Sequence, residues 1–164
     1  MKPITFSCRE TLRFSPKEIA AQVLDVSKWT GFHGYGPLPG IKAAEFETRT
    51  PRISGSRIRV TNADGSSHVE EIVAWEPERR LVLRLGDFSK PLASIATHFI
   101  ETWDFERAGN ETKVARSFEV YPKSLVAKPL LWVISCFLKR AIARHLHEMR
   151  IGTGGNGVDV RPAG

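Results

Sequence analysis

The sequence has little cysteine and no long hydrophobic run. Its 164 residues include only two cysteines, Cys8 and Cys136, which are too few for a disulfide framework or a zinc site. No apolar stretch approaches the roughly 18 residues that a membrane-spanning helix needs. The opening residues, MKPITFSCRE, lack the apolar block of a signal peptide. We therefore expect a cytoplasmic protein with reduced thiols and no metal site.

Motifs for nucleotides and nucleic acids are also missing. No glycine-rich fingerprint, phosphate loop or metal-ligand cluster is present, so we expect no cofactor. The net charge is +6, and residues 123–150 carry six Lys or Arg against Glu148 alone. A second basic cluster, within 49–59, contains four arginines and no acid. Neither cluster contains a nucleic-acid motif, so we expect no nucleic-acid partner. Two interpretations of the basic clusters remain: each is a solvated face, or each binds an anionic surface.

The patterns that are present indicate a single mixed α+β domain. The segment Ser15-Pro-Lys-Glu18 has the residues of a helix start, and a second short helix follows at 27–32. Apolar residues repeat every three or four positions from Ser124 to about Arg150, which predicts one long amphipathic helix. Alternating segments separated by turns predict antiparallel strands. These strands are expected at 3–14, 41–49, 56–62, 68–76, 80–86, 94–106 and 112–121.

Several short motifs in this order resemble one superfamily. They are FSPKEI at 14–19, DVSKW at 25–29, Gly55, VEEI at 69–72, EPERRL at 76–81, TWDF at 102–105 and TKV at 112–114. Together they resemble the START/birch-pollen-allergen-like (SRPBCC) superfamily, and within it the polyketide cyclase/dehydrase-like branch. The resemblance implies a helix-grip fold, in which a curved antiparallel sheet of about seven strands (β-α-α-β6-α) wraps around a long C-terminal helix and leaves an internal cavity. Residues 1–150 are expected to form this ligand-binding domain, and the Gly-rich segment 151–164 is expected to be a disordered tail.

Strand alternation predicts which polar groups face the cavity. The strand at 68–76 has two apolar faces, and the resemblance favours the one that carries Glu70. Alternation places the side chains of Glu10, Glu70 and Glu101 on the inner face. These three carboxylates cannot all lie unpaired in an apolar interior, so Arg116 is predicted to pair with Glu70 or Glu101. Such a pair either ties strands together or holds the polar end of a ligand. The side chains predicted to contact a ligand are Glu10, Tyr35, Glu70, Ile72, Glu101, Trp103, Arg116, Phe118, Ile134 and Phe137.

Two further segments have open interpretations. The loop 31–40, with four glycines and two prolines, is either a plain surface loop or a gate over the cavity that carries Tyr35. In the run 129–138, PLLWVISCFL, one helix face should close the barrel and leave Leu131 and Trp132 outside. Trp132 beside basic residues suits a peripheral membrane contact or a dimer contact, and packing under the 31–40 loop is the alternative. The chain is expected to be a monomer or a homodimer.

Three functions fit these residues. The first is a carrier or binding protein for a hydrophobic small molecule such as a lipid, a polyketide or another ring-bearing ligand. The second is a cyclase/dehydratase-type enzyme, in which Glu70 is the candidate catalytic acid or base. The third is a co-chaperone-like interaction protein that uses the basic C-terminal helix. The fold does not choose between them, because one fold supports many functions.

Overall fold

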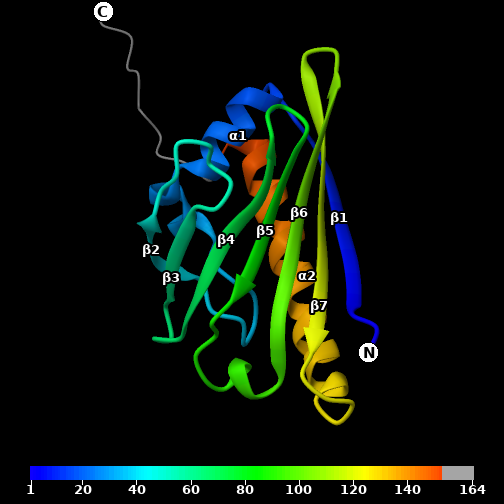
Figure 1. The fold of residues 1–164 in the computed structure, drawn as a ribbon. Coiled ribbons are helices and arrows are strands. Elements are labelled where there is room, and N and C mark those ends of the chain that lie inside the picture. Colours follow the sequence, from blue (N-terminus) through cyan, green and yellow to red (C-terminus); the bar gives the residue numbers. More distant parts are fainter. Residues whose placement is uncertain (153–164) are drawn as a thin grey trace, which may run out of the picture.

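The protein is a curved antiparallel sheet folded around one long helix (Figure 1). The computed structural model describes residues 1–152. Seven strands lie in the spatial order β1-β7-β6-β5-β4-β3-β2, and all neighbours are antiparallel. The strands are β1 (Ile4–Leu12), β2 (Ile41–Thr48), β3 (Arg57–Asn62), β4 (Ser67–Glu76), β5 (Arg80–Gly86), β6 (Ala96–Ala108) and β7 (Glu111–Pro122). This is the predicted α+β helix-grip architecture.

The segment between the two edge strands begins as the sequence predicts. Helix α1 (Pro16–Leu24) starts with a capping box, in which Ser15 Oγ accepts from Glu18 N at 3.2 Å and Glu18 Oε2 accepts from Ser15 N at 2.7 Å. The 3₁₀ helix η1 (Val26–Gly31) follows directly. The Trp29 indole N–H donates to the Val23 carbonyl at 2.7 Å, so this tryptophan ties η1 to α1.

The long helix α2 (Lys128–Ile151) begins later than predicted. Residues 124–127 form a turn, in which the Ala127 N–H bonds to Ser124 Oγ at 3.1 Å. Pro129 then occupies the first helical turn, where its missing N–H costs no hydrogen bond. Leu131, expected outside, is fully buried, because it shares the sheet-facing side of α2 with Leu138 and other residues at three- and four-residue spacing. Most of the expected tail, residues 153–164, lies outside the described residues.

Alternation along the strands places most buried side chains correctly, but not all of β4 and not every strand end. On β4, Glu70 and Ile72 are buried while Val73 is exposed, so this part of the favoured face points inward. A register shift between Ile72 and Ala74 then turns Trp75 of the other face against the core, and Val69 of that face is buried too. Strand β1 ends at Leu12 rather than at residue 14. Beyond it, the Thr112 hydroxyl of β7 donates to the Phe14 carbonyl at 2.6 Å, and Ser15 already caps α1. A short 3₁₀ helix, η2 (Leu92–Ser94), was not anticipated.

The placement of α2 explains why the interior is not filled. This helix packs mainly against β1 and β7, at one edge of the sheet. Strands β3, β4 and β5 curve away from it on the other side (Figure 1). Because the sheet bends around the helix without contacting it along its whole width, side chains leave a space between the two.

Candidate functional site: an apolar cavity with a buried polar network

A cavity of about 420 Å³ occupies the space between the concave face of the sheet and α2. Its wall is mostly apolar, as is typical of a small-molecule site. The exposed side chains of Lys28, Asp64 and Lys90 lie around it. The apolar lining includes Leu83, Leu85, Phe99 and Phe118 from the sheet, Ile134, Phe137, Leu138, Ile142 and Met149 from α2, and Phe32, Leu38, Phe88 and Leu92 from the connecting segments.

An ion pair between Glu101 and Arg116 lies in the wall of this cavity. The two residues come from the neighbouring strands β6 and β7, and they are 2% and 9% exposed. Arg116 Nε donates to Glu101 Oε1. The guanidinium carbon lies 4.3 Å from the centre of the Trp103 ring, which adds a cation–π contact. The structure therefore shows one of the two pairings that the sequence predicts for Arg116.

His145 of α2 extends this pair into a network. Its Nδ1 lies 3.1 Å from Arg116 Nη1. A guanidinium only donates, so Nδ1 accepts and the ring proton is on Nε2. Burial, the positive charge of Arg116 and His33 together lower the pKa of His145 to about 3. His145 is therefore uncharged at neutral pH and carries one N–H donor.

The pKa of the Glu101 carboxyl is shifted upward. Burial raises it, Arg116 opposes the shift, and the carboxyl of Glu70 raises it further. The nearby Trp103 indole N–H stabilises the Glu101 carboxylate and so acts to lower its pKa. The Trp103 Nε1 atom is buried, and its geometry does not meet that of a hydrogen bond to any residue within 1–152. The network thus contains one strongly desolvated carboxyl, one arginine and an indole N–H that is left over.

A second polar pair lies on β4. His68 Nε2 is 3.0 Å from Glu70 Oε1, and both side chains line the cavity. They point the same way because they are two residues apart on one strand. The Phe88 ring packs against the His68 ring, with 6.0 Å between the ring centres. Glu70 is thereby held by histidine rather than by Arg116.

The structure places most of the predicted ligand contacts at the cavity. Seven of the ten line it: Glu70, Glu101, Trp103, Arg116, Phe118, Ile134 and Phe137. Whether these residues contact a ligand stays a prediction. The other three, Glu10, Tyr35 and Ile72, lie outside the lining.

Glu10 faces α2 rather than the cavity. Its carboxylate lies 3.1 Å from Arg150 Nη1 and 3.8 Å from His147 Nδ1, on the last turns of the helix. Alternation correctly placed Glu10 on the inner side of β1. It could not show that α2 covers this strand and supplies two basic partners there.

Tyr35 and Ile72 are displaced from the cavity for different reasons. Tyr35 pairs with Leu38 through two backbone hydrogen bonds of 3.1 and 3.0 Å, and Leu38 rather than Tyr35 lines the cavity. The turn requires Gly34, whose φ is +72° and where a Cβ would overlap the Leu38 carbonyl oxygen. Ile72 is fully buried in the core, where neighbouring apolar side chains fill the space.

Two histidines of the site, His145 and His68, were not among the predicted ligand contacts. His145 follows Phe137 by eight residues and Ala141 by four, so it lies on the same helical stripe, and this spacing was the available signal. His68 shares the inward face of β4 with Glu70. A single histidine in an apolar pattern does not by itself distinguish a packed ring from a ligand contact, and only the position of Arg116 makes His145 informative.

Fold and site together define a class. A curved antiparallel sheet that surrounds a C-terminal helix and leaves an apolar cavity is the helix-grip fold. The family model described as polyketide cyclase / dehydrase and lipid transport matches residues 4–150. The chain belongs to this family. No curated protein matches the chain.

Solved structures show the same fold at low sequence identity. The protein TTHA0849 from Thermus thermophilus has a TM-score of 0.68 at 14% identity, covering 93% of this chain and 100% of its own. A START superfamily protein from Mycobacterium smegmatis has a TM-score of 0.62 at 14% identity, covering 88% and 98%. Ara h 8.0201 has a TM-score of 0.59 at 18% identity, covering 88% and 98%. At these identities the likeness concerns the fold alone.

The ion pair makes a prediction for stability. Arg116→Met leaves the Glu101 carboxyl buried without its partner, so the free energy of unfolding at neutral pH should fall by about 3–5 kcal/mol. The double variant Glu101→Met/Arg116→Met removes both charges and should recover most of that loss. Urea unfolding of the wild type and the variants measures this cycle. A double variant as unstable as Arg116→Met would show that the pair does not act as a unit.

The pKa of His145 makes a prediction for pH. In the unfolded chain a histidine binds its proton near pH 6.5, whereas native His145 does so only at about pH 3. Between these values the unfolded state holds more protons, so native stability falls as the pH falls, by up to about 1.4 kcal/mol per unit. Relative to His145→Gln, the wild type should lose about 1.6 kcal/mol between pH 6.5 and 5. Parallel stability curves for the two proteins would contradict this assignment.

Proposed function

We propose that the protein binds a hydrophobic small molecule that carries an uncharged polar group, and that it acts as a carrier or binding protein. The observation that supports this most directly is the composition of the cavity wall. Apolar side chains form most of it, and the buried Glu101–Arg116–His145 network interrupts them at one place. A ligand that matches both parts is apolar over most of its surface and polar at one point.

The charges in the interior favour an uncharged group. The positive charge of Arg116 is already neutralised by Glu101. Glu70 adds another buried carboxyl, and His145 is uncharged. An anionic head group placed against this network would meet two acidic side chains and no free cation. The only cations of the lining beyond Arg116 are Lys28 and Lys90, both exposed, within the part of the chain that the structure describes.

The hydrogen-bond donors favour an oxygen acceptor. Within residues 1–152, neither Trp103 Nε1 nor His145 Nε2 donates a hydrogen bond to another protein group. Trp103 Nε1 is covered by protein atoms and lies near the Glu101 carboxyl, so the donor that a ligand in the cavity can meet is the N–H of His145. We therefore assign a carbonyl or hydroxyl oxygen as the polar group that the His145 N–H recognises.

Competition for a neutral dye tests this proposal. N-phenyl-1-naphthylamine should fluoresce in the cavity, and 1-dodecanol should displace it at a concentration at least about tenfold lower than dodecanoate at neutral pH. Ile134→Trp, which narrows the cavity, should abolish dye binding. Val133→Trp is the matched control, because Val133 is the next residue of α2 but is 43% exposed.

The same assay has a result that contradicts the proposal. In Glu101→Gln, the preference for the alcohol should shrink to within about threefold or reverse, because the positive charge of Arg116 is then left without its partner and can pair with the dodecanoate carboxylate. Equal displacement by dodecanol and dodecanoate in the wild type would overturn the assignment of an uncharged polar group. Dye binding that survives Ile134→Trp would overturn the cavity as its site.

A cyclase/dehydratase-type enzyme is the second candidate function. The pair of His68 and Glu70 favours it, because both side chains line the cavity and Glu70 is not neutralised by arginine. A carboxylate held in this way is suited to accept the proton alpha to a ligand carbonyl. The enolate oxygen formed by that transfer would be stabilised by Arg116, the buried cation of the wall, whereas Tyr35 lies outside the lining.

Hydrogen exchange on a model ketone tests the enzyme hypothesis. With 2-tetralone in D2O, an acid–base role predicts that the protein accelerates exchange of the alpha hydrogens over buffer, as followed by NMR. Glu70→Gln should lower that acceleration by about 10²–10⁴-fold. Glu71→Gln is the matched control, since the neighbouring Glu71 is paired with Arg57 on the other side of the strand. No acceleration by the wild type, or equal rates in Glu70→Gln, would leave the carrier function alone.

A further inference from the structure

Exposed hydrophobic side chains gather where α2 begins. Eight large hydrophobic residues are exposed among residues 1–152, and five of them lie between 125 and 133. We call these five the α2 patch: Leu125, Val126, Leu130, Trp132 and Val133, which are between 43% and 90% exposed. Isolated exposed hydrophobics are ordinary on protein surfaces, but a contiguous group that includes a tryptophan indicates a binding surface.

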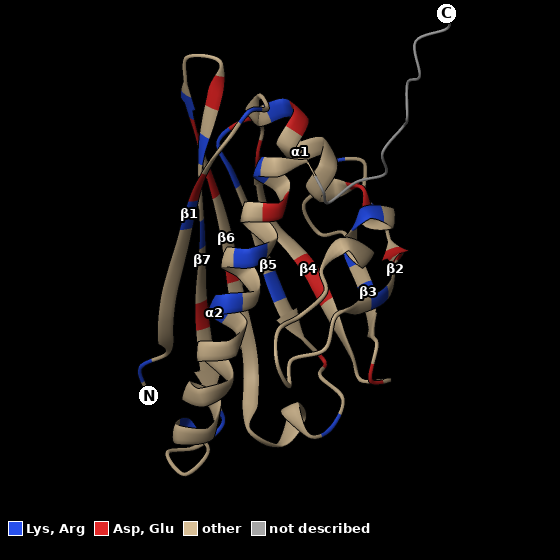
Figure 2. Cartoon of the chain, turned by 180° about the vertical axis from the view of Figure 1, so that it is seen from behind, with Lys and Arg blue, Asp and Glu red and all other residues tan. Residues whose placement is uncertain are grey.

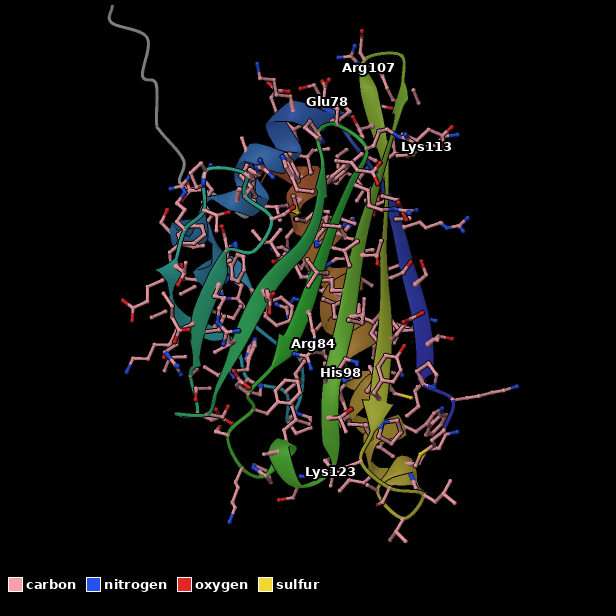
Figure 3. The ribbon with its side chains drawn as sticks, in the orientation of Figure 1. Glu78, Arg84, His98, Arg107, Lys113 and Lys123 are labelled. Atoms are coloured by element: carbon pink, nitrogen blue, oxygen red, sulfur yellow. The ribbon has the colours of Figure 1, made fainter. Side chains whose placement is uncertain are left out.

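The surroundings of the α2 patch are basic. From Val120 to His147 the sequence contains no Asp or Glu, and it contains five Lys or Arg. Figure 2 shows blue but no red on the half of α2 nearest its start. Of these five, only Arg144 makes a salt bridge within the described chain, with Glu148. Lys123, which Figure 3 labels at this end of the molecule, is among the unpaired four.

The α2 patch adjoins the cavity. On a helix, residues four apart are neighbours, so Leu130 lies beside Ile134 and Val133 beside Phe137, and both of these neighbours line the cavity. Lys123 also bonds to the segment around η2, through Nζ to the Ala93 carbonyl at 3.0 Å. That segment supplies the exposed lining residues Lys90 and Pro91.

We propose that the α2 patch docks on an anionic lipid surface. Exposed apolar side chains that include a tryptophan, with four Lys or Arg close in sequence that form no salt bridge within residues 1–152, suit a bilayer that presents negative head groups. A second copy of the chain fits less well, because pairing two such surfaces would bring their cations together without acidic partners nearby in sequence. No helix within residues 1–152 is long and apolar enough to cross a membrane.

Docking in this way brings the cavity lining close to the bilayer. If the cavity holds a hydrophobic ligand, as proposed above, the ligand passes between lipid and protein without crossing water. Only this consequence depends on the proposed function. The docking itself requires no ligand.

Vesicle sedimentation tests the docking. The wild type should bind vesicles of mixed phosphatidylcholine and phosphatidylglycerol, bind pure phosphatidylcholine weakly, and lose binding as salt is raised. Val126→Ser/Trp132→Ser should lower the partition coefficient by about tenfold or more. Val73→Ser is the control: Val73 is 44% exposed, as Val133 is at 43%, but it lies on β4 outside the α2 patch. It should bind within about twofold of the wild type.

Three results would overturn the docking. The first is that the wild type does not bind anionic vesicles, and the second is that Val126→Ser/Trp132→Ser binds them as well as the wild type does. The third is that the wild type is a dimer, that this double variant is a monomer, and that neither protein binds vesicles. The last would assign the α2 patch to self-association. Dye displacement by dodecanol on the same variants separates this test from the proposed function, since all of them should retain it.

Discussion

The ion pair between Glu101 and Arg116 is the interaction on which the site depends. Each side chain comes from a central strand and would be costly to bury alone in an apolar wall. Once paired with Glu101, the guanidinium lies over the Trp103 ring and still has a donor directed at His145 of α2. One cation therefore joins two strands to the helix in the wall of the cavity. It also determines which nitrogen of His145 carries the proton, and so what the site can offer a ligand.

The cavity and the α2 patch favour different but compatible binding partners. Inside, Arg116 is already paired with Glu101 and Glu70 adds a second carboxyl, so the N–H of His145 favours a neutral oxygen on an apolar molecule. Outside, the cations around the α2 patch are unmatched, so they favour an anionic surface. A hydrophobic ligand dissolves poorly in water. A binding protein whose cavity lining adjoins a lipid-facing surface can take up such a ligand without its passing through water. The two proposals rest on separate residues and can fail separately.

Much of this arrangement could be predicted from the sequence, and the misses have physical causes. Strand alternation depends only on backbone geometry, so it placed Glu101 and Arg116 on the inner face correctly. It does not depend on what covers a strand, so it could not show that α2 pairs with Glu10. The start of α2 was misplaced because residues before Pro129 continue the apolar pattern while the backbone forms a turn. The role of His145 needed three-dimensional contact with Arg116, which no spacing along the chain encodes.

The most direct test of the central claim is the identity of what the cavity holds. Native mass spectrometry of freshly purified protein, followed by denaturation and analysis of the released molecule, measures it. The account predicts a one-to-one adduct that is hydrophobic and carries a hydroxyl or carbonyl group but no anionic group. A bound phosphate ester, carboxylate or other anion would contradict it, as would a protein that takes up no apolar alcohol supplied in excess.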